Sequence, residues 1–466
     1  LHRLIRRQRQ MCIRDRYQVE SIDKKHRHMT YWDMFATWVG ANANNGTWFI
    51  GGIIAACGFW GGIKALILAS SISYIFLMLV GYMGTKTGVT TMALSRASFG
   101  IRGSIIPSIV NLTQFVGWTA VNTFIAATSV SYILHSFLGW PVYGQPGGNL
   151  GLIVGIAVMS LLHLISIVSG QKSIQIIERI GIILVIIFVI WESIVVFKDV
   201  SFSQIAAWKV PSHLKMGFGT AMDTLAAFNL AWVTAGADFT RFTKKSVTAT
   251  TAPFLGANLG VFGFAFIGLS ATISIAISSG VYDPNNSDPS TIANRLGLGL
   301  IAMIVIMLTS MTANAVNIQA AGSALNNMFT KLTLKQSLLI TTVIATLVTF
   351  IPVFYGSFLE TFTAFLDYVG MVLGPIISIM VVDYFLISKQ KYDPMELGNP
   401  NGRYWYKNGI HWTAFILWLV GVIFYSLLQK LDFVQTYTGA TFIVMIIIGI
   451  LYWLIMQFEK RNSNVN

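Results

Sequence analysis

The sequence predicts an all-α integral membrane protein, and three observations support this fold class. Hydrophobic residues make up 55% of the 466-residue chain and charged residues only 11%, whereas about 25% of the residues in a typical soluble domain are charged. The mean hydropathy is +0.66. Apolar stretches long enough to cross a bilayer recur along the chain, and helices suit such stretches because their backbone groups pair internally.

About twelve helical spans are expected. Their ranges are 32–60, 63–84, 104–133, 149–169, 176–197, 218–240, 252–280, 297–327, 336–355, 358–386, 410–429 and 434–457. An even number places both termini on one side of the membrane. Lys and Arg are concentrated after even-numbered spans, for example Lys86 and Arg96 after the second. The positive-inside rule then predicts a multi-pass protein of the plasma (inner) membrane with cytoplasmic termini.

The first span is interrupted at its centre by six small or polar residues, 42–47 (NANNGT). Unsatisfied backbone and amide groups at that depth are costly unless they line a cavity or bind something. A membrane helix broken at mid-depth is typical of the substrate or ion site of a transporter.

Other spans carry polar or aromatic residues at the same depth. They are Gln114, Gly117, Trp118 and Asn122 in the third span, Asn229, Trp232 and a second break at 234–237 in the sixth, Thr309, Thr312, Asn314 and Asn317 in the eighth, and Asp367 in the tenth. Their common depth predicts a single binding site.

These residues also have simpler structural explanations. Ser and Thr in membrane helices often bond to their own backbone, Asn and Gln often bridge helices, and Trp118 could serve in packing. Asp367 is the one acid expected at the midplane, where an ionisable group is a functional candidate. It could carry a proton, bind a cation or accept hydrogen bonds from a substrate.

The two breaks lie five spans apart and predict two inverted five-helix repeats followed by two further helices. We expect one transporter domain, 17–466, with repeats at 30–200 and 215–390 and C-terminal helices at 408–458. The arginine-rich segment 1–16 is interpreted as a non-native or disordered basic extension.

Other classes of protein are disfavoured. The net charge of +13 is spread over short loops, which suits lipid headgroups and not nucleic acid. The two cysteines, Cys12 and Cys57, provide neither a disulfide framework nor a metal site. No cofactor is expected, and one buried acid is too few for an enzyme. A channel would need a continuous polar stripe, so the pattern favours a carrier.

Several motifs resemble the nucleobase–cation symporter 1 family (the purine/cytosine permease family), and cytosine permeases in particular. They are GYMGTKTG at 81–88, SFG at 98–100, RGS at 102–104, TQ at 113–114, GW at 117–118, ADFTRF at 237–242 and DY at 383–384. The resemblance covers roughly 30–390. It implies a five-plus-five inverted-repeat fold with alternating access and a flat heterocycle stacked between aromatic groups.

The resemblance also assigns site residues. Trp118 matches the stacking tryptophan of the family, and Asn122 matches a position that hydrogen-bonds the ring. Asn229 stands where the family usually has an aromatic residue, so Phe228 or Trp232 is expected to stack instead. The expected substrate-binding set is completed by Trp48, Gln114 and Asn317.

For the coupling cation, the family's sodium site uses main-chain oxygens of the broken first helix and hydroxyls of the eighth. Asn44 and Thr47 match the first group, and Thr309 and Thr312 match the second. Ala313 replaces an adjacent hydroxyl, so proton coupling through Asp367 is the alternative to sodium.

We therefore expect a monomeric cation symporter, driven by Na⁺ or H⁺, that imports a nucleobase. Cytosine or a purine is the favoured cargo. The alternatives are another heterocycle (allantoin, hydantoin, uracil or a thiamine precursor) or, on the same fold, an amino acid or amine.

Overall fold

The first membrane-crossing helix is divided into α2 (Tyr31–Asn42) and α3 (Asn45–Ile54). Between them Asn44 is extended (φ −143°, ψ 169°), and its Oδ1 accepts the backbone N–H of Thr47 at 3.1 Å. Its Nδ2 donates to the Ala41 carbonyl at 2.7 Å. One amide thus satisfies backbone groups on both sides of the gap, and the predicted break in the first span is confirmed.

A second break separates α10 (Phe218–Val233) from α11 (Gly236–Thr240). In this break the Thr234 hydroxyl lies 2.7 Å from Asn111 Oδ1 and accepts a hydrogen bond from Gln114 Nε2 at 3.2 Å. Both partners belong to α6 (Ile105–Leu138), so a neighbouring helix stabilises the interruption. The predicted break in the sixth span is also confirmed.

The computed structural model describes residues 21–169, 171–329, 331–355, 357–400 and 402–463. The segment 1–16 lies outside these residues. The other helices are α4 (Phe59–Thr87), α5 (Thr91–Phe99), α7 (Asn149–Ser169), α8 (Gln171–Asp199), α9 (Phe202–Ala207), α12 (Ser246–Ser279), α13 (Pro289–Arg295), α14 (Gly299–Met328), α15 (Leu334–Thr349), α16 (Ile351–Tyr355), α17 (Phe358–Val382), α18 (Trp412–Leu428) and α19 (Thr441–Ser463).

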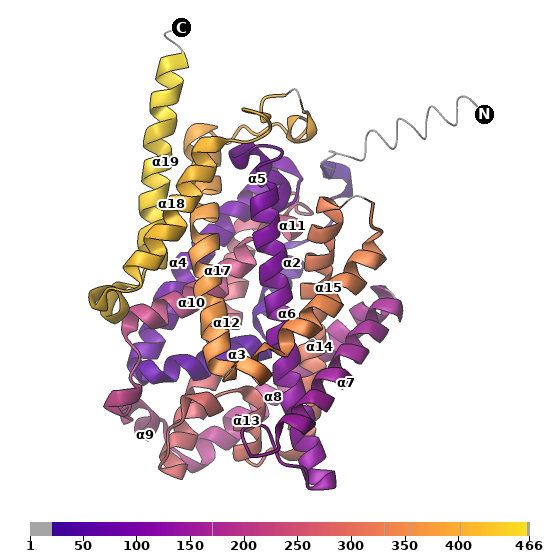
Figure 1. Ribbon diagram of the computed structural model, residues 1–466, viewed down its shortest axis with the longest axis vertical. Coiled ribbons are helices and arrows are strands. Elements are labelled where there is room, and N and C mark those ends of the chain that lie inside the picture. Colours follow the sequence, from indigo (N-terminus) through magenta and orange to yellow (C-terminus); the bar gives the residue numbers. More distant parts are fainter. Residues whose placement is uncertain (1–20, 170, 330, 356, 401, 464–466) are drawn as a thin grey trace, which may run out of the picture.

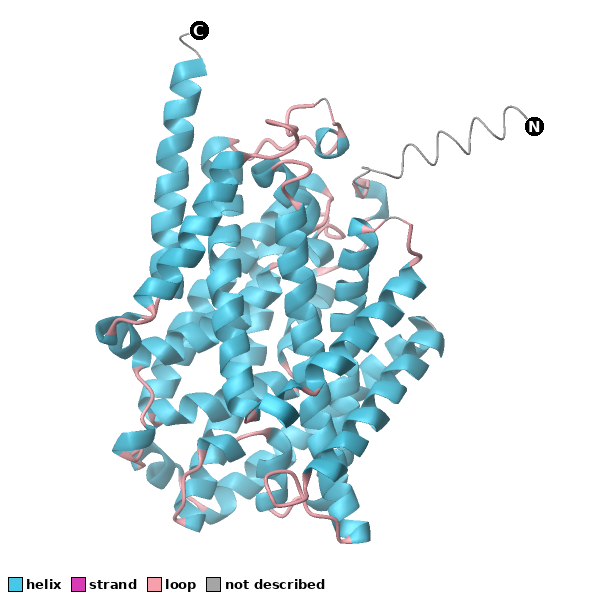
Figure 2. Ribbon diagram, in the orientation of Figure 1, coloured by secondary structure: helices cyan, strands magenta, loops and turns pink. Residues whose placement is uncertain are grey.

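Each predicted span corresponds to one of these helices or to a pair of them. Within the described ranges, 8 helices are long and apolar enough to cross a membrane, and Asn45–Cys57 and Trp412–Leu428 are shorter apolar helices. Figure 2 shows helices joined by loops, and the same ranges contain isolated bridges but no strand. The predicted all-α membrane fold is therefore confirmed.

Helices α6 and α14 pack along each other in the middle of the bundle, and α12 packs against α2, α3 and α4. Helices α18 and α19 lie at the edge beside α17 (Figure 1). Helices α18 and α19 contribute no residue to the pocket between α6, α10 and α14.

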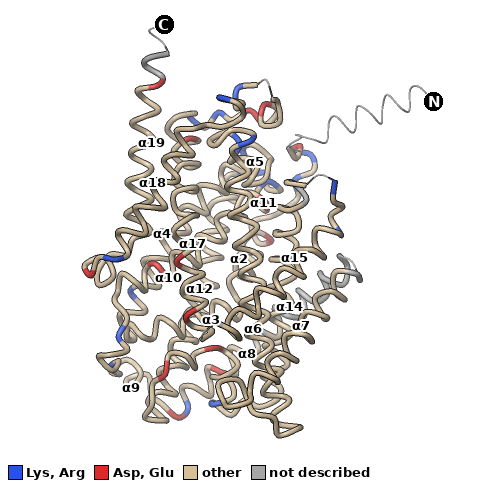
Figure 3. Tube along the Cα trace, viewed as in Figure 1, with Lys and Arg blue, Asp and Glu red and all other residues tan. Residues whose placement is uncertain are grey.

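The basic residues are unevenly distributed between the two ends of the bundle. The end at which α19 finishes also carries the loop between α17 and α18 (Figure 1), and Lys and Arg gather there in Figure 3. That loop contains Lys389, Lys391, Arg403 and Lys407.

Glycines bring α3 against α12. A Cβ added at Gly51 would lie 2.1 Å from the Ala265 carbonyl oxygen, and one added at Gly268 would lie 2.0 Å from the Trp48 carbonyl oxygen. Close helix contacts of this kind stabilise membrane bundles through van der Waals packing. The position of the broken helix thus depends on these two glycines.

We predict that Gly51→Ala lowers the free energy of unfolding by about 1–3 kcal/mol, because the added methyl overlaps a backbone carbonyl. The matched control is Gly263→Ala on α12, where an added Cβ meets nothing within 4 Å. Thermal unfolding of the detergent-solubilised protein should show a lower midpoint for Gly51→Ala only. Equal midpoints for the two variants would contradict the close α3–α12 contact.

Candidate functional site

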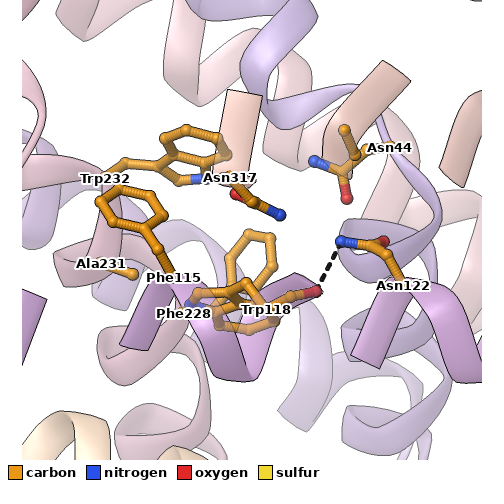
Figure 4. A pocket seen from close by; sticks show the side chains of 9 residues that line it. Asn44, Phe115, Trp118, Asn122, Phe228, Ala231, Trp232 and Asn317 are labelled. Atoms are coloured by element: carbon orange, nitrogen blue, oxygen red, sulfur yellow. Dashed lines mark hydrogen bonds between the residues drawn. The ribbon is translucent and has the colours of Figure 1, made fainter. Parts of the chain in front are cut away.

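A pocket lies where the start of α3 meets α6, α10 and α14 (Figure 4). Its lining residues are Asn44, Phe115, Trp118, Asn122, Phe228, Ala231, Trp232, Ala313 and Asn317. About 320 Å³ inside this ring is free of protein atoms, part of it open to solvent. Little of this space would admit a molecule larger than water, so a ring would bind here by moving the lining side chains apart.

Trp118 is the aromatic centre of the pocket. Its ring lies 5.2 Å from that of Phe228 at an interplanar angle of 90°, and 5.3 Å from that of Phe365 on α17 at 76°. Gly117 makes room for Phe365, since a Cβ there would lie 2.2 Å from its ring. The neighbouring rings therefore meet Trp118 at steep angles and do not stack parallel to it.

Two polar atoms of the pocket have no hydrogen-bond partner among the described residues, namely Trp118 Nε1 and Asn122 Oδ1. Asn122 Nδ2 donates to the Trp118 carbonyl at 3.0 Å, which holds the amide in place with its oxygen free. Trp118 and Asn122 are only 6% and 3% exposed. Buried polar groups are normally paired, so one free donor and one free acceptor indicate a ligand with complementary groups.

The pocket has a polar side and an aromatic side. In Figure 4 the amides of Asn44 and Asn122 lie on one side, and Trp232 and Phe115 lie on the other. None of the lining residues is charged. The site therefore suits a neutral, partly aromatic ligand, because a buried charge would need a counter-ion that the lining does not supply.

The structure brings together six of the residues predicted for the site. They are Trp118, Asn122, Phe228, Trp232, Asn317 and Asn44. Sequence reasoning missed Phe115, Ala231 and Ala313 as lining residues. Helical spacing could have found them, because each lies three or four positions from a predicted residue on the same helix.

Three other residues predicted to bind substrate lie outside the lining. Asn229 is fully buried against α4, where its Nδ2 donates to Ser70 at 3.0 Å and its Oδ1 lies 2.8 Å from the Tyr74 hydroxyl. Gln114 serves the α10–α11 break, as described above. The Trp48 indole N–H donates at 2.7 Å to Glu192 on α8. Each side chain is engaged in contacts between helices.

The four residues predicted to bind the cation are close in sequence to a contact between α3 and α14. That contact is made by Asn45, whose Nδ2 lies 2.9 Å from the Ile306 carbonyl, 2.7 Å from Thr309 Oγ1 and 3.0 Å from Ser310 Oγ. Asn44 caps α3, and Thr47 Oγ1 is buried without a partner among the described residues. Thr309 Oγ1 accepts a hydrogen bond from Asn45, and Thr312 Oγ1 donates to the Thr309 carbonyl at 2.7 Å. Their role in cation binding remains a prediction.

The expectation of a single buried acid in the spans was wrong. Asp367 is exposed, lies outside the pocket lining and accepts a hydrogen bond from Gln429 Nε2 at 2.6 Å. Among the described residues of the spans, three acids are buried, namely Glu192, Asp383 and Asp223, at 0%, 3% and 6% exposed. Asp223 accepts the backbone N–H groups of Ala440 and Thr441 at the start of α19. Hydropathy indicates the depth of a residue but not the side of its helix that faces the bundle.

Two interrupted helices that meet at an uncharged pocket inside a membrane bundle define a secondary transporter. The chain belongs to the permease family for cytosine/purines, uracil, thiamine and allantoin, whose profile matches residues 21–455. The family predicted from the motifs is thereby confirmed, and its members are permeases and not enzymes.

Individual relatives agree with this assignment. The allantoin permease of Bacillus subtilis is 24% identical over 444 residues, which cover 90% of this chain and 88% of that protein. The purine-uracil permease NCS1 of Arabidopsis thaliana is 27% identical over 483 residues, covering 94% and 77%. The inward-facing structure of Mhp1 matches with a TM-score of 0.77 at 19% identity, covering 95% and 94% of the two chains. This match confirms the predicted five-plus-five fold.

The contact made by Asn45 yields a prediction that needs no ligand. Asn45→Ala removes three buried hydrogen-bond contacts between α3 and α14, and should lower the free energy of unfolding by about 1–3 kcal/mol. Asn258→Ala on α12 is the matched control, because the Asn258 amide donates only to the Phe254 carbonyl of its own helix. Thermal unfolding of both variants measures the effect. If Asn45→Ala lowers the midpoint no more than Asn258→Ala does, the contact between α3 and α14 is contradicted.

Proposed function

We propose that this protein imports a nucleobase by cation symport, with cytosine or a purine as the first cargo to test. The observation that carries the proposal is the free amide oxygen of Asn122, one turn from the indole ring of Trp118 on α6. A base that stacks on this indole ring can donate a lactam or amidine N–H to the Asn122 oxygen.

In the proposed binding mode the ring lies against the aromatic side chains of the pocket. Stacking of a base on an aromatic side chain contributes about 1–3 kcal/mol. Asn122 Oδ1 would accept from a ring or exocyclic N–H, and the amides of Asn44 and Asn317 would read the remaining polar edge. Phe228 bounds the ring where the resemblance expects a stacking partner.

Other rings with the same donor and acceptor groups compete for this assignment. Allantoin, hydantoin, uracil and a thiamine precursor are all neutral and partly planar, and the family description includes uracil, thiamine and allantoin. An amino acid fits less well. Its carboxylate would need a cation or free N–H groups, yet Asn44 already occupies the Thr47 N–H at the start of α3.

Alternating access requires barriers on both sides of the pocket. Toward the start of α17, Phe358 stacks on Phe124 at 4.1 Å and on Phe49 at 5.2 Å, and Phe362 links this cluster to Trp118 at 5.7 Å. We propose that this aromatic cluster is the outer barrier.

At the opposite end of the bundle, α5 and α11 are joined by hydrogen bonds. Asp238 Oδ2 accepts the Thr91 N–H and Thr91 Oγ1 accepts the Ala237 N–H, both at 3.0 Å. We propose that these bonds belong to the inner barrier. The basic residues gathered at this end favour a cytoplasmic location for it by the positive-inside rule. With that orientation, transport through a monomer in the plasma membrane is uptake.

The cargo is tested by uptake of radiolabelled cytosine into a bacterial host that lacks nucleobase transport. Unlabelled adenine, uracil, allantoin and hydantoin serve as competitors, and the ring that competes best identifies the cargo. Saturable uptake of at least one of them is expected. No uptake of any ring, by protein shown to be folded in the membrane, would contradict the proposal.

We predict that Trp118→Ala weakens cargo binding by about 1–3 kcal/mol, which is roughly 5–150-fold, through lost stacking. Trp60→Ala is the control, because Trp60 is 54% exposed on α4. Competition binding to the purified protein measures both variants. Equal affinities for the two would exclude Trp118 as the stacking residue.

A further inference from the structure

A fully buried acid on α8 is joined to the broken first helix. Glu192 is 0% exposed, and its Oε2 accepts the indole N–H of Trp48 on α3 at 2.7 Å. Its Oε1 has no hydrogen-bond partner among the residues that the structure describes. Trp48 lies one turn beyond Asn44, which lines the pocket. The acid is therefore one rigid helical turn from the proposed cargo site.

The helices around this acid offer it no counter-ion. α7, α12 and α14 pack against α8, and α3 reaches it through Trp48. The sequences of α3, α12 and α14 contain no Asp, Glu, Lys, Arg or His, and α7 contains only His163, which lies 3.3 Å from the Asn314 amide. The nearest charges along α8 are Lys198 and Asp199 at its end. An unpaired carboxylate in such surroundings is costly, whereas a neutral carboxylic acid is not.

A second unpartnered polar group lies at about the same level of the bundle as Glu192, although the two are not hydrogen-bonded to each other. Ser274 on α12 lies 3.4 Å from the Val196 carbonyl on α8, and both helices are odd-numbered spans that run in the same direction. One turn back along each helix therefore brings Ser270 to the level of Glu192. The Ser270 hydroxyl is buried and has no partner within the described ranges.

We propose that Glu192 binds the coupling proton and that Trp48 transmits its protonation to α3. Protonated Glu192 is neutral, stays buried and keeps its bond to Trp48, so that α3 is held with Asn44 at the pocket. Loss of the proton leaves a carboxylate that needs water, which opens the α3–α8 contact. The cargo site and the proton site are thereby linked through one helix. This inference rests on the proposed function and assigns its coupling ion.

The test uses the full chain in liposomes that enclose a pH-sensitive dye. The counterflow rates of labelled cytosine, adenine, uracil and allantoin are first compared in the wild type. The ring with the fastest counterflow then serves as the cargo in the gradient experiments. An inside-alkaline pH gradient should drive its accumulation together with internal acidification. In Glu192→Gln, gradient-driven accumulation should be lost, so that cargo reaches only the level seen without a gradient, while counterflow continues. Gln can still accept the Trp48 N–H, so the fold should be kept.

Asp367→Asn is the matched control, because it also converts an acid in a span to an amide, and it should accumulate cargo as the wild type does. The proposal would be overturned if Glu192→Gln still accumulated cargo in response to the pH gradient, or if Asp367→Asn failed to do so. It would also be overturned if sodium drove accumulation by the wild type without internal acidification.

An infrared pH titration of the reconstituted protein separates this inference from the proposed function, since it needs no cargo. A carboxylic C=O band that is present in the wild type and in Asp367→Asn, and missing in Glu192→Gln, would support a proton on Glu192 even if no ring is transported. An identical titration of Glu192→Gln and the wild type would overturn the inference, even if the rings are transported.

Discussion

The structure depends on how the interruption of the first span is satisfied. A break in a helix inside a bilayer frees backbone groups that water cannot reach, and each would cost several kcal/mol without a partner. Here Asn44 closes the gap with its own amide, and Asn45 ties the restarted helix to α14 through three contacts. The break is thereby stable enough to serve as one wall of a binding pocket.

The short helix that follows the break links three features of the molecule. Its first turn presents Asn44 to the pocket, Asn45 to α14 and Trp48 to Glu192. Glycines on α3 and α12 let the two helices approach closely, so α3 is held on several sides by specific contacts. An element of this kind can couple two sites if it has two discrete arrangements, since a shift at one contact changes the others.

Much of the fold followed from the sequence, because hydropathy sets the spans and a run of small and polar residues inside an apolar stretch can only be a break. The sequence did not show which side of each helix faces the pocket and which side faces a neighbouring helix. Phe228 and Asn229 are adjacent at one depth, yet Phe228 faces the pocket and Asn229 faces α4, because neighbours decide which side of α10 is buried. Glu192 was overlooked among apolar residues, and its contact with Trp48 joins residues 144 positions apart. No local pattern could have revealed that pairing.

We infer that a neutral ring binds against Trp118 and donates a hydrogen bond to Asn122. The most direct test is a cryo-electron microscopy structure of the full chain with the ring that competes best in uptake. We expect planar density in contact with the Trp118 side chain and within hydrogen-bond distance of Asn122 Oδ1. Density for the ring at another place in the bundle, with this pocket filled by protein side chains, would contradict it.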